Sequence, residues 1–397
     1  MAASLHFLIA GGGIGGLAAA YVLARDGHRV TVLEQQAQFG EIGAGIQLGP
    51  NIFRMFDWLG LTQAINAVAY FPPGMGMNDV RTGEKVVRVP FGDAVKALYG
   101  YPYGVIYRAD LHKVLLDACA RFGDVVLRTS SKVEGFEQSG SAVSVKLASG
   151  ERLSGDALIG ADGLWSRIRE AIVGDGKPRV SGHIAYRAVL KREDVPRHLW
   201  NDEVLLWGGE KTHLVHYPLR RGELFNLVAV FHSNKYDEGW NTFGDTAELN
   251  ERFADAVPQV RELLGKIETW KMWVLCDREP VKNWSDGRVT LLGDAAHPML
   301  QYLAQGAGQA IEDAVVLGQA LKATRGDVAP AFIQYQQARY LRTGRVQLTA
   351  RFYGDIYHAS GVTRELRNQM FQGGKESAGF AGLKWMYEGI DPERMFA

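Results

Sequence analysis

The sequence of 397 residues predicts an α/β fold in which a Rossmann-like, parallel-sheet domain is interrupted by a second domain built on a mixed or antiparallel β-sheet. Two observations predict it. Residues 5–34 read as a buried strand, a glycine-rich turn, a helix and a second buried strand. Residues 180–273 instead show short stretches in which apolar and polar side chains alternate, which is the pattern of half-buried antiparallel strands.

Buried strands return at residues 156–160 and 288–292, so the first domain is expected to be discontinuous. We assign residues 1–72, 104–179 and 274–355 to this domain and residues 73–103 and 180–273 to the sheet domain. Residues 356–397 form a C-terminal segment with enough apolar side chains to cover a pocket or to join a dimer.

The glycine-rich turn places five glycines among residues 11–16. In a strand–turn–helix unit Gly11 permits the tight turn, Gly13 lets backbone N–H groups approach a pyrophosphate, and Gly16 lets the helix pack on the strand. The N-terminus of the helix, with Gly15 in its first turn, attracts phosphate electrostatically. The turn therefore predicts a dinucleotide-binding site.

The second strand of this unit ends at Glu34, and Gln35 follows it. An acidic residue about 20 positions after the first glycine is where a carboxylate meets ribose hydroxyls. A bound adenine dinucleotide is therefore expected, and these residues alone do not distinguish NAD from FAD.

The same N-terminal segment has no charged residue before Arg25, which is also typical of a signal peptide or a membrane anchor. It lacks the Lys or Arg that opens a signal peptide, and its glycines interrupt the apolar run. We therefore expect neither export nor membrane insertion.

Charge and cysteine content limit the kinds of partner and metal site that can be expected. The chain carries 44 Lys and Arg against 44 Asp and Glu, so nucleic acid and anionic membranes are not expected partners. Cys119 and Cys276 lie far apart and outside any metal-ligand spacing. This composition fits a reducing cytoplasm and predicts no metal site.

Two further segments before residue 120 bear on a ligand. Small residues surround Gln47 in a glycine-rich loop, which suggests close approach to a flat ligand, and a helix is predicted from Pro50. Arg108 opens another predicted helix. An arginine there is either an ordinary surface charge or a contact to pyrophosphate, since the forked guanidinium suits phosphate.

Two later strands end in a turn that joins glycine to an acid, Asp162-Gly163 and Gly293-Asp294. Asp-Gly is also favoured in ordinary turns, so neither pair is specific by itself. Ser166 is the predicted N-cap of the helix after the first pair.

A helix is predicted to begin at Gly306, Ala307 and Gly308. We expect Glu312 and Asp313 in its first turns to stabilise its positive N-terminus.

Taken in order, the glycine turn, Asp162-Gly163 and the segment Gly293 to Pro298 (Gly-Asp-Ala-Ala-His-Pro) resemble the motifs of the single-component flavoprotein aromatic hydroxylases, the family of p-hydroxybenzoate and salicylate hydroxylases. The resemblance spans nearly the whole chain. It implies one bound FAD, reduction by NADH (or NADPH) without a second Rossmann domain, and ring hydroxylation with O2 through a flavin C4a-hydroperoxide.

The resemblance also implies roles for individual residues. Arg108 reaches the cofactor, Asp294 binds a ribityl hydroxyl, and Asp162 is linked to both FAD and NAD(P)H. The predicted cofactor-binding residues are Gly11, Gly13, Gly15, Gly16, Glu34, Gln35, Gln47, Arg108, Asp162, Asp294, Gly306, Ala307 and Gly308.

Two segments bear on the aromatic substrate. Alternation along residues 212–219 puts His213 and Tyr217 on one strand face and His216 on the other. Gln301 follows the Gly293-Asp294 turn and is expected near the flavin ring. Together these segments resemble the branch of the family that hydroxylates 3-hydroxybenzoate para to its phenol, which yields gentisate.

Hydroxylation of a phenol is favoured by its phenolate, so a general base is useful. We predict His213 as that base, because the ordinary pKa of histidine is close to neutral. Tyr217 would hold the substrate and Gln301 would orient it. Each residue also has a simpler explanation: a hydrogen-bonded core histidine, sheet packing and a loop brace.

Three alternatives remain open. The first is a decarboxylating salicylate or 6-hydroxynicotinate hydroxylase of the same family, which releases CO2. The second is a flavin reductase or dehydrogenase, which does not couple O2 to product. The third is a non-catalytic FAD-binding module. A homodimer is possible in every case.

Overall fold

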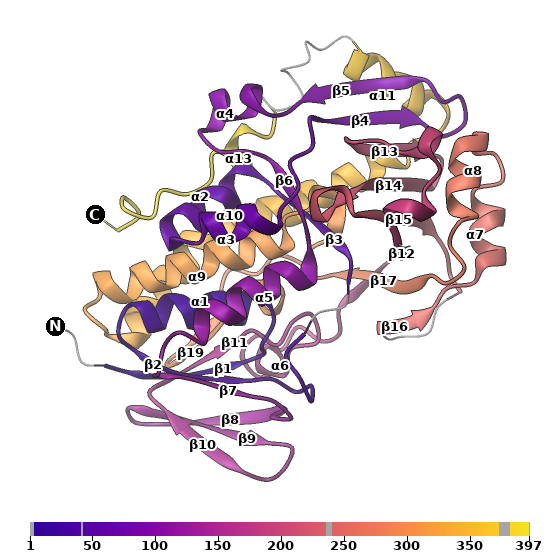
Figure 1. Ribbon diagram of the computed structural model, residues 1–397. Coiled ribbons are helices and arrows are strands. Elements are labelled where there is room, and N and C mark those ends of the chain that lie inside the picture. Colours follow the sequence, from indigo (N-terminus) through magenta and orange to yellow (C-terminus); the bar gives the residue numbers. More distant parts are fainter. Residues whose placement is uncertain (1–3, 41–42, 236–239, 373–381, 397) are drawn as a thin grey trace.

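The computed structural model describes residues 4–40, 43–235, 240–372 and 382–396, and two large sheets organise it (Figure 1). The first sheet has the strand order β18-β19-β11-β1-β2-β7. Its strands are parallel except β18, which pairs antiparallel with β19. The bounds are β1 His6–Ala10, β2 Arg29–Leu33, β7 Val125–Arg128, β11 Ala157–Gly160, β18 Ser285–Asp286 and β19 Val289–Leu291.

The parallel sheet lies between a helical layer and a small sheet (Figure 1). On the helical side α1 (Ile14–Arg25) packs against α5 (Arg108–Cys119) and α9 (Gly306–Ala323). The small sheet has the order β10-β9-β8 (Arg152–Gly155, Ala142–Leu147 and Val133–Ser139). Covering both faces explains why β1 and β11 read as nearly continuous apolar runs.

The second large sheet has eight strands in the order β16-β17-β12-β15-β14-β13-β4-β5. Neighbouring strands are antiparallel except β13 and β4. The bounds are β4 Gly74–Asp79, β5 Lys85–Pro90, β12 Arg179–Lys191, β13 Val204–Gly209, β14 Thr212–Leu219, β15 Leu224–His232, β16 Trp240–Phe243 and β17 Lys271–Asp277. Two segments far apart in the chain therefore build one sheet.

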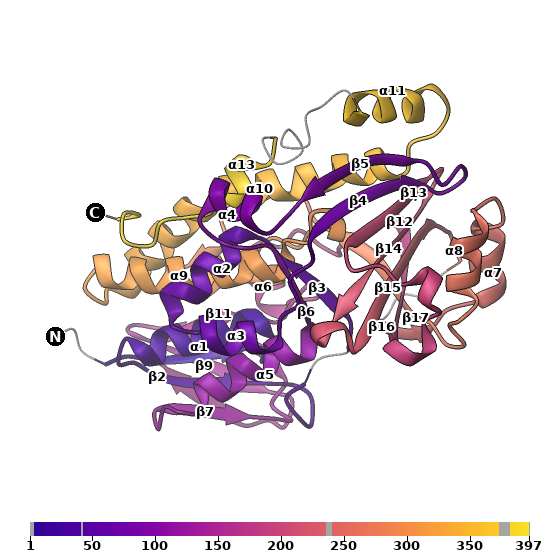
Figure 2. The same cartoon turned by 45° about the horizontal axis from the view of Figure 1, so that its top comes forward.

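Two helices cover the outer face of this sheet, α7 (Thr246–Arg252) and α8 (Pro258–Leu264) (Figure 2). Residues 253–257 separate the two helices, and Pro258 occupies the first turn of α8, where its fixed φ and missing N–H are tolerated.

The remaining elements connect and close the two sheets. Helix α10 lies beside α9 (Figures 1 and 2) and also contacts β18, β19 and η5. The bounds are β3 Gly45–Leu48 paired with β6 Gly104–Tyr107, α2 Pro50–Leu59, α3 Thr62–Val68, α4 Asp93–Tyr99, α6 Arg167–Ile172, α10 Val328–Tyr357, α11 Gly361–Gln372 and α13 Lys384–Tyr387, with 3-10 turns η1 Arg192–Asp194, η2 Arg197–Leu199, η3 Arg220–Gly222, η4 Gly293–Ala295 and η5 Gln301–Leu303.

The predicted α/β fold with a separate, mostly antiparallel sheet is confirmed. The residue boundaries between the two domains stay a prediction, and β17 crosses the one proposed at residue 273. Helix α4 was not predicted. Among the described residues, none of the helices combines the length and the apolar character that crossing a bilayer requires.

Candidate active site

A cavity of about 470 Å³ lies where the carboxyl ends of β1, β11 and β19 face the inner side of the eight-stranded sheet. Ligands of parallel α/β sheets bind at such carboxyl ends. Ten predicted site residues line it: Gly13, Gly15, Gln47, Arg108, His213, Tyr217, Asp294, Gln301, Gly306 and Ala307. From the C-terminal segment, Leu383 and Tyr387 also reach it.

The glycine turn is built for close backbone approach. Gly11 has φ +108°, and a Cβ there would lie 2.2 Å from the carbonyl oxygen of Ala161. A Cβ on Gly16 would lie 2.0 Å from the carbonyl oxygen of Gly11. Neither position accepts a side chain, and neither lines the cavity, so these two glycines shape the turn that Gly13 and Gly15 present to it.

Two helices point their N-termini at the cavity. Gly13 caps α1 and Gln305 caps α9, and neither cap uses a side-chain hydrogen bond. The first N–H groups of both helices are therefore left to a ligand, and both helix dipoles present their positive ends to it. Arg108, the first residue of α5, adds a full positive charge to the same cavity. This cradle fits the diphosphate of FAD.

Asp294 lies beside the start of α9, where a Cβ on Gly306 would be 3.7 Å from its Oδ1. Burial raises the pKa of Asp294, and His297 and Arg108 oppose that shift. The side chain of Asp294 is open to the cavity, and a carboxyl next to a helix N-terminus is a suitable acceptor for a sugar hydroxyl. Gln47 lines the same cavity and accepts a 2.7 Å hydrogen bond from the hydroxyl of Tyr103.

Glu34 lies outside the cavity lining, at the edge of the glycine turn. Its Oε2 accepts from the N–H of Gly12 at 2.9 Å and its Oε1 from the N–H of Gln36 at 2.8 Å. The carboxylate is thus oriented by backbone and remains partly exposed, beside the exposed Gln35. Its contact with ribose stays a prediction.

Asp162 and Gly308 are engaged within the protein. Asp162 accepts from the hydroxyl of Ser166 at 2.5 Å and from the N–H of Arg167 at 2.8 Å, so it supports the start of α6. Ser166 caps this helix, as its sequence position predicts. A Cβ on Gly308 would lie 2.1 Å from Ile52, so this glycine lets α9 pack on α2.

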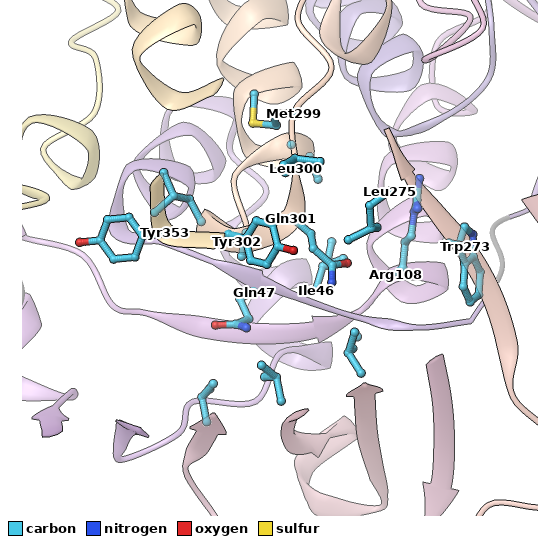
Figure 3. A pocket seen from close by; sticks show the side chains of 18 of the residues that line it. Ile46, Gln47, Arg108, Trp273, Leu275, Met299, Leu300, Gln301, Tyr302 and Tyr353 are labelled. Atoms are coloured by element: carbon cyan, nitrogen blue, oxygen red, sulfur yellow. The ribbon is translucent and has the colours of Figure 1, made fainter. Parts of the chain in front are cut away.

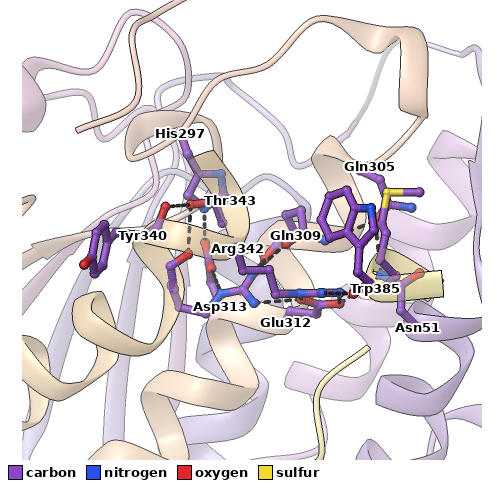
Figure 4. A network of polar contacts seen from close by, with 12 residues as sticks. Asn51, His297, Gln305, Gln309, Glu312, Asp313, Tyr340, Arg342, Thr343 and Trp385 are labelled. Atoms are coloured by element: carbon purple, nitrogen blue, oxygen red, sulfur yellow. Dashed lines mark hydrogen bonds and ion pairs between the residues drawn. The ribbon is translucent and has the colours of Figure 1, made fainter. Parts of the chain in front are cut away.

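A buried ionic network holds the turn that carries Asp294 (Figure 4). Asp313 accepts from the N–H of Gly293 at 2.9 Å, from Nε2 of His297 at 2.6 Å and from Nε of Arg339 at 2.7 Å. Glu312 accepts from Nη1 of Arg339 at 2.7 Å and from Nδ2 of Asn51 at 2.8 Å.

The predicted dipole role of Glu312 and Asp313 is therefore wrong. Both side chains are fully buried, and their ion-pair partners include Arg339 of α10 and, for Asp313, His297, rather than the N-terminus of their own helix. Burial opposes ionisation of Glu312, but Arg342 and Arg339 outweigh it and lower the pKa to about 2. The network fixes the Gly293 turn against α10.

His213 and Tyr217 face the cavity from β14, and both are buried. His216 is absent from the lining and accepts a 2.9 Å hydrogen bond from Nε1 of Trp207, as the alternation predicts. Nδ1 of His213 lies 2.7 Å from Nε2 of His358. Nε2 of His213 is therefore the nitrogen available to a ligand.

The electrostatics of His213 differ from the expectation. Burial, with His183 and His232 nearby, lowers the pKa of His213 to about 3. The imidazole is neutral at physiological pH and does not hold a second proton readily. Burial also raises the pKa of Tyr217 above its usual value, so Tyr217 keeps its hydroxyl proton.

Arg187 is a cavity residue that sequence reasoning missed. Its Nη2 donates a hydrogen bond to Oε1 of Gln301, whose side chain Figure 3 shows among those of Tyr302, Leu275 and Ile46. Its buried Nε has no hydrogen-bond partner among the described residues. Burial and the charge of Arg108 lower its pKa to about 10, so the guanidinium stays positive. The sequence feature that could have indicated Arg187 as a site residue is its position within the alternating strand from Tyr186 to Leu190.

Sequence reasoning also missed three histidines behind His213. Ring nitrogens of His183, His232 and His358 lie within 4.8 Å of one another. A hydrogen bond of 3.0 Å between His232 and His358 occupies two of these nitrogens, so the group is a set of hydrogen-bonded rings. Because these three histidines come from distant segments of the chain, no local sequence motif predicts that they meet.

Comparison with known proteins identifies the family. The family model described as FAD binding domain matches residues 4–346. The 3-hydroxybenzoate 6-hydroxylase of Polaromonas naphthalenivorans (strain CJ2) is 46% identical over 385 residues, which cover 97% of this chain and 96% of that protein.

Solved structures agree with this match. Klebsiella pneumoniae HpxO, complexed with FAD and uric acid, superposes with a TM-score of 0.85 at 27% identity and covers 97% of each chain. A salicylate hydroxylase substrate complex superposes with a TM-score of 0.81 at 25% identity, covering 99% of this chain and 97% of the other. The chain therefore belongs to the family of FAD-dependent aromatic hydroxylases, monooxygenases that take FAD as cofactor and NAD(P)H as co-substrate.

Proposed function

We propose that the protein hydroxylates 3-hydroxybenzoate para to its phenol and so produces 2,5-dihydroxybenzoate, gentisate. One observation carries the proposal: the cavity combines a neutral imidazole, His213, with a positive guanidinium, Arg187, that no acidic side chain among the described residues neutralises. The first suits a phenol and the second suits a carboxylate.

The spacing along β14 supports this substrate. His213 and Tyr217 are four residues apart on one strand face, a separation of about 13 Å. A hydroxybenzoate fits between them with its phenol at His213 and its carboxylate at Tyr217. The strand register places Arg187 opposite Val228, and Val228 opposite Val215. Val215 lies midway between His213 and Tyr217 on β14. Arg187 can therefore assist Tyr217 in binding the carboxylate.

The chain's own residues then prepare the ring. Reduced FAD, when bound, supplies an activated oxygen atom derived from O2. His213 accepts the phenolic proton, which raises electron density at C6, the carbon para to the phenol. Gln301, held by Arg187, orients the substrate. The mostly apolar lining, including Val215, limits access of water to the reacting atoms.

A screen of hydroxybenzoates tests the proposal. NADH oxidation and O2 consumption are measured with 3-hydroxybenzoate, salicylate, 4-hydroxybenzoate and 6-hydroxynicotinate, and products are identified. Gentisate from 3-hydroxybenzoate without CO2 release is expected. Catechol and CO2 from salicylate, with no gentisate, would instead establish the decarboxylating activity. Repeating the assay with NADPH decides the reductant, for which we propose NADH.

We further propose a homodimer in the cytoplasm. Both α10 and α11 expose apolar side chains at helical spacing: Leu341, Leu348 and Phe352 on α10, and Val362, Leu366 and Met370 on α11. Exposed apolar side chains of this kind on consecutive helices are typical of an interface. Light scattering should give twice the monomer mass, and the double change Leu341→Lys and Phe352→Lys should halve it. The two free cysteines, Cys119 and Cys276, suit a reducing compartment.

A further inference from the structure

Four histidines from four separate segments meet at one end of the cavity. His183 lies on β12, His213 on β14 and His232 at the end of β15, while His358 follows α10. The strand register pairs His183 with His232. The N–H of Lys211 donates to the carbonyl of His358 at 3.3 Å, which ties the end of α10 to the sheet.

Three of these rings form a continuous chain of hydrogen bonds. Nδ1 of His213 lies 2.7 Å from Nε2 of His358, and Nδ1 of His358 lies 3.0 Å from Nε2 of His232. His213 lines the cavity, His358 is buried, and His232 is partly exposed. The chain therefore leads from the cavity to the protein surface.

The rings in this chain are neutral. Burial, together with the neighbouring imidazoles, lowers the pKa of His213 to about 3 and lowers the pKa of His358 still further. Each ring thus carries one N–H. For Nε2 of His213 to accept a proton, its Nδ1 must carry the hydrogen and donate it to His358, which in turn donates from Nδ1 to His232.

We propose that His213, His358 and His232 form a proton relay that carries the phenolic proton of the substrate from the cavity to solvent. The inference rests on the proposed function. The substrate O–H bond breaks as an N–H bond forms at Nε2 of His213. The Nδ1 proton of His213 moves to Nε2 of His358, the Nδ1 proton of His358 moves to Nε2 of His232, and the Nδ1 proton of His232 passes to water.

Each ring gains one proton and loses one, so every ring ends neutral in its other tautomer and the substrate is left as phenolate. This resolves the difficulty that burial creates for His213. An isolated histidine with so low a pKa would have to hold an unfavourable positive charge. A histidine that passes its second proton on avoids that charge.

The inner part of the relay is enclosed by aromatic groups. The ring of Tyr357 has its centroid 5.7 Å from that of His213. His183 stacks on His232 with centroids 4.1 Å apart, and its Nδ1 lies 2.5 Å from the hydroxyl of Tyr302. These contacts hold the rings in place and exclude water from the inner links.

Charged groups face the outer end. Burial, Lys211 and Arg252 lower the pKa of His232, and Asp355 opposes them. Lys211 and Asp355 are both exposed and His232 is partly exposed, so the last ring of the relay stands beside solvent, which can take the proton. This is the position a proton exit requires.

Proton release on ligand binding tests the relay directly. Oxidised holoenzyme is mixed with 3-hydroxybenzoate in a weakly buffered solution that contains an indicator dye, and release is followed by stopped flow. One proton per bound ligand is expected, and none with 3-methoxybenzoate. His358→Phe keeps a ring but removes both nitrogens, and should slow release about 100-fold.

His232→Gln changes the partly exposed end, where folding is least at risk, and should also slow release. His216→Gln is the matched control, because His216 is buried on the opposite face of β14. FAD content and 3-methoxybenzoate affinity establish that each variant is folded.

The outcomes separate the two proposals. Slow release in both relay variants, with a normal control, supports the relay. Release at the original rate in His358→Phe, or no release from the unaltered enzyme, overturns it. Intact release without gentisate would reject the proposed function while the relay stands.

Discussion

Nη2 of Arg187 donates a hydrogen bond to Oε1 of Gln301, which joins β12 of the eight-stranded sheet to η5 beyond the Gly293 turn. Both side chains line the cavity. The arginine thus orients a predicted substrate residue and also presents its charge to the ligand. Replacing Arg187 should weaken substrate binding more than it destabilises the fold, because no acidic partner among the described residues is left unpaired.

Arg187→Met should raise the KM for 3-hydroxybenzoate about 10- to 100-fold, since a charge-assisted contact to the carboxylate is lost. Steady-state kinetics with NADH measure this KM. Arg192→Met is the control, because Arg192 lies over the ring of Trp200 and outside the cavity lining. An unchanged KM would exclude Arg187 from carboxylate binding.

His213→Gln should keep FAD and lose most hydroxylation, by about 100-fold or more. The amide cannot accept the phenolic proton and pass another on. NADH oxidation should continue with formation of H2O2, because the oxygen atom then finds no activated ring. Product and peroxide are measured together, with His216→Gln as the control, and a fully coupled variant would contradict the assignment.

Glu34→Ala should weaken FAD retention about tenfold. The change removes a carboxylate predicted to bind ribose and frees the N–H of Gly12 in the glycine turn. Glu34→Gln retains an acceptor for that N–H and isolates the effect of the charge. Flavin lost on dialysis measures the effect, with Glu137→Gln as a surface control. Full retention in Glu34→Ala would exclude the ribose contact.

Arg339→Met should lower the free energy of unfolding by about 3–5 kcal/mol and loosen FAD, because it removes the buried guanidinium that Glu312 and Asp313 share. Thermal unfolding and flavin content measure the two effects. Arg345→Met on the exposed side of the same helix is the control. Equal stability of the two variants would show that the network does not support the Gly293 turn.

His216→Gln should flatten the pH dependence of stability. Burial lowers the pKa of His216 to about 3, below the ordinary value of 6.5, so below pH 6.5 the unfolded chain binds a proton that the folded chain does not. Falling pH therefore costs the folded state about 1.4 kcal/mol per pH unit for this residue. The glutamine still accepts from Trp207 but does not titrate. Urea unfolding between pH 7.5 and 5.0 should show the difference, and parallel curves would contradict it.

The sequence by itself determined the features that depend on near neighbours in the chain. The strand–turn–helix unit, the cap at Ser166 and the alternation that separates His213 from His216 all follow from interactions within a few residues. For these features steric limits at glycine and the two-residue period of a strand leave little choice. The motif order along the chain was enough to predict the family.

Only the tertiary structure decided which distant side chains meet. Arg187 contacts Gln301 across 114 positions, and His213 contacts His358 across 145. From the sequence, Glu312 and Asp313 were predicted to stabilise the helix N-terminus. In the structure Arg339 of α10 forms ion pairs with both of them. The low pKa of His213 has the same origin. It comes from burial and from neighbours on other segments, and desolvation is a property of the packed molecule that no local pattern encodes.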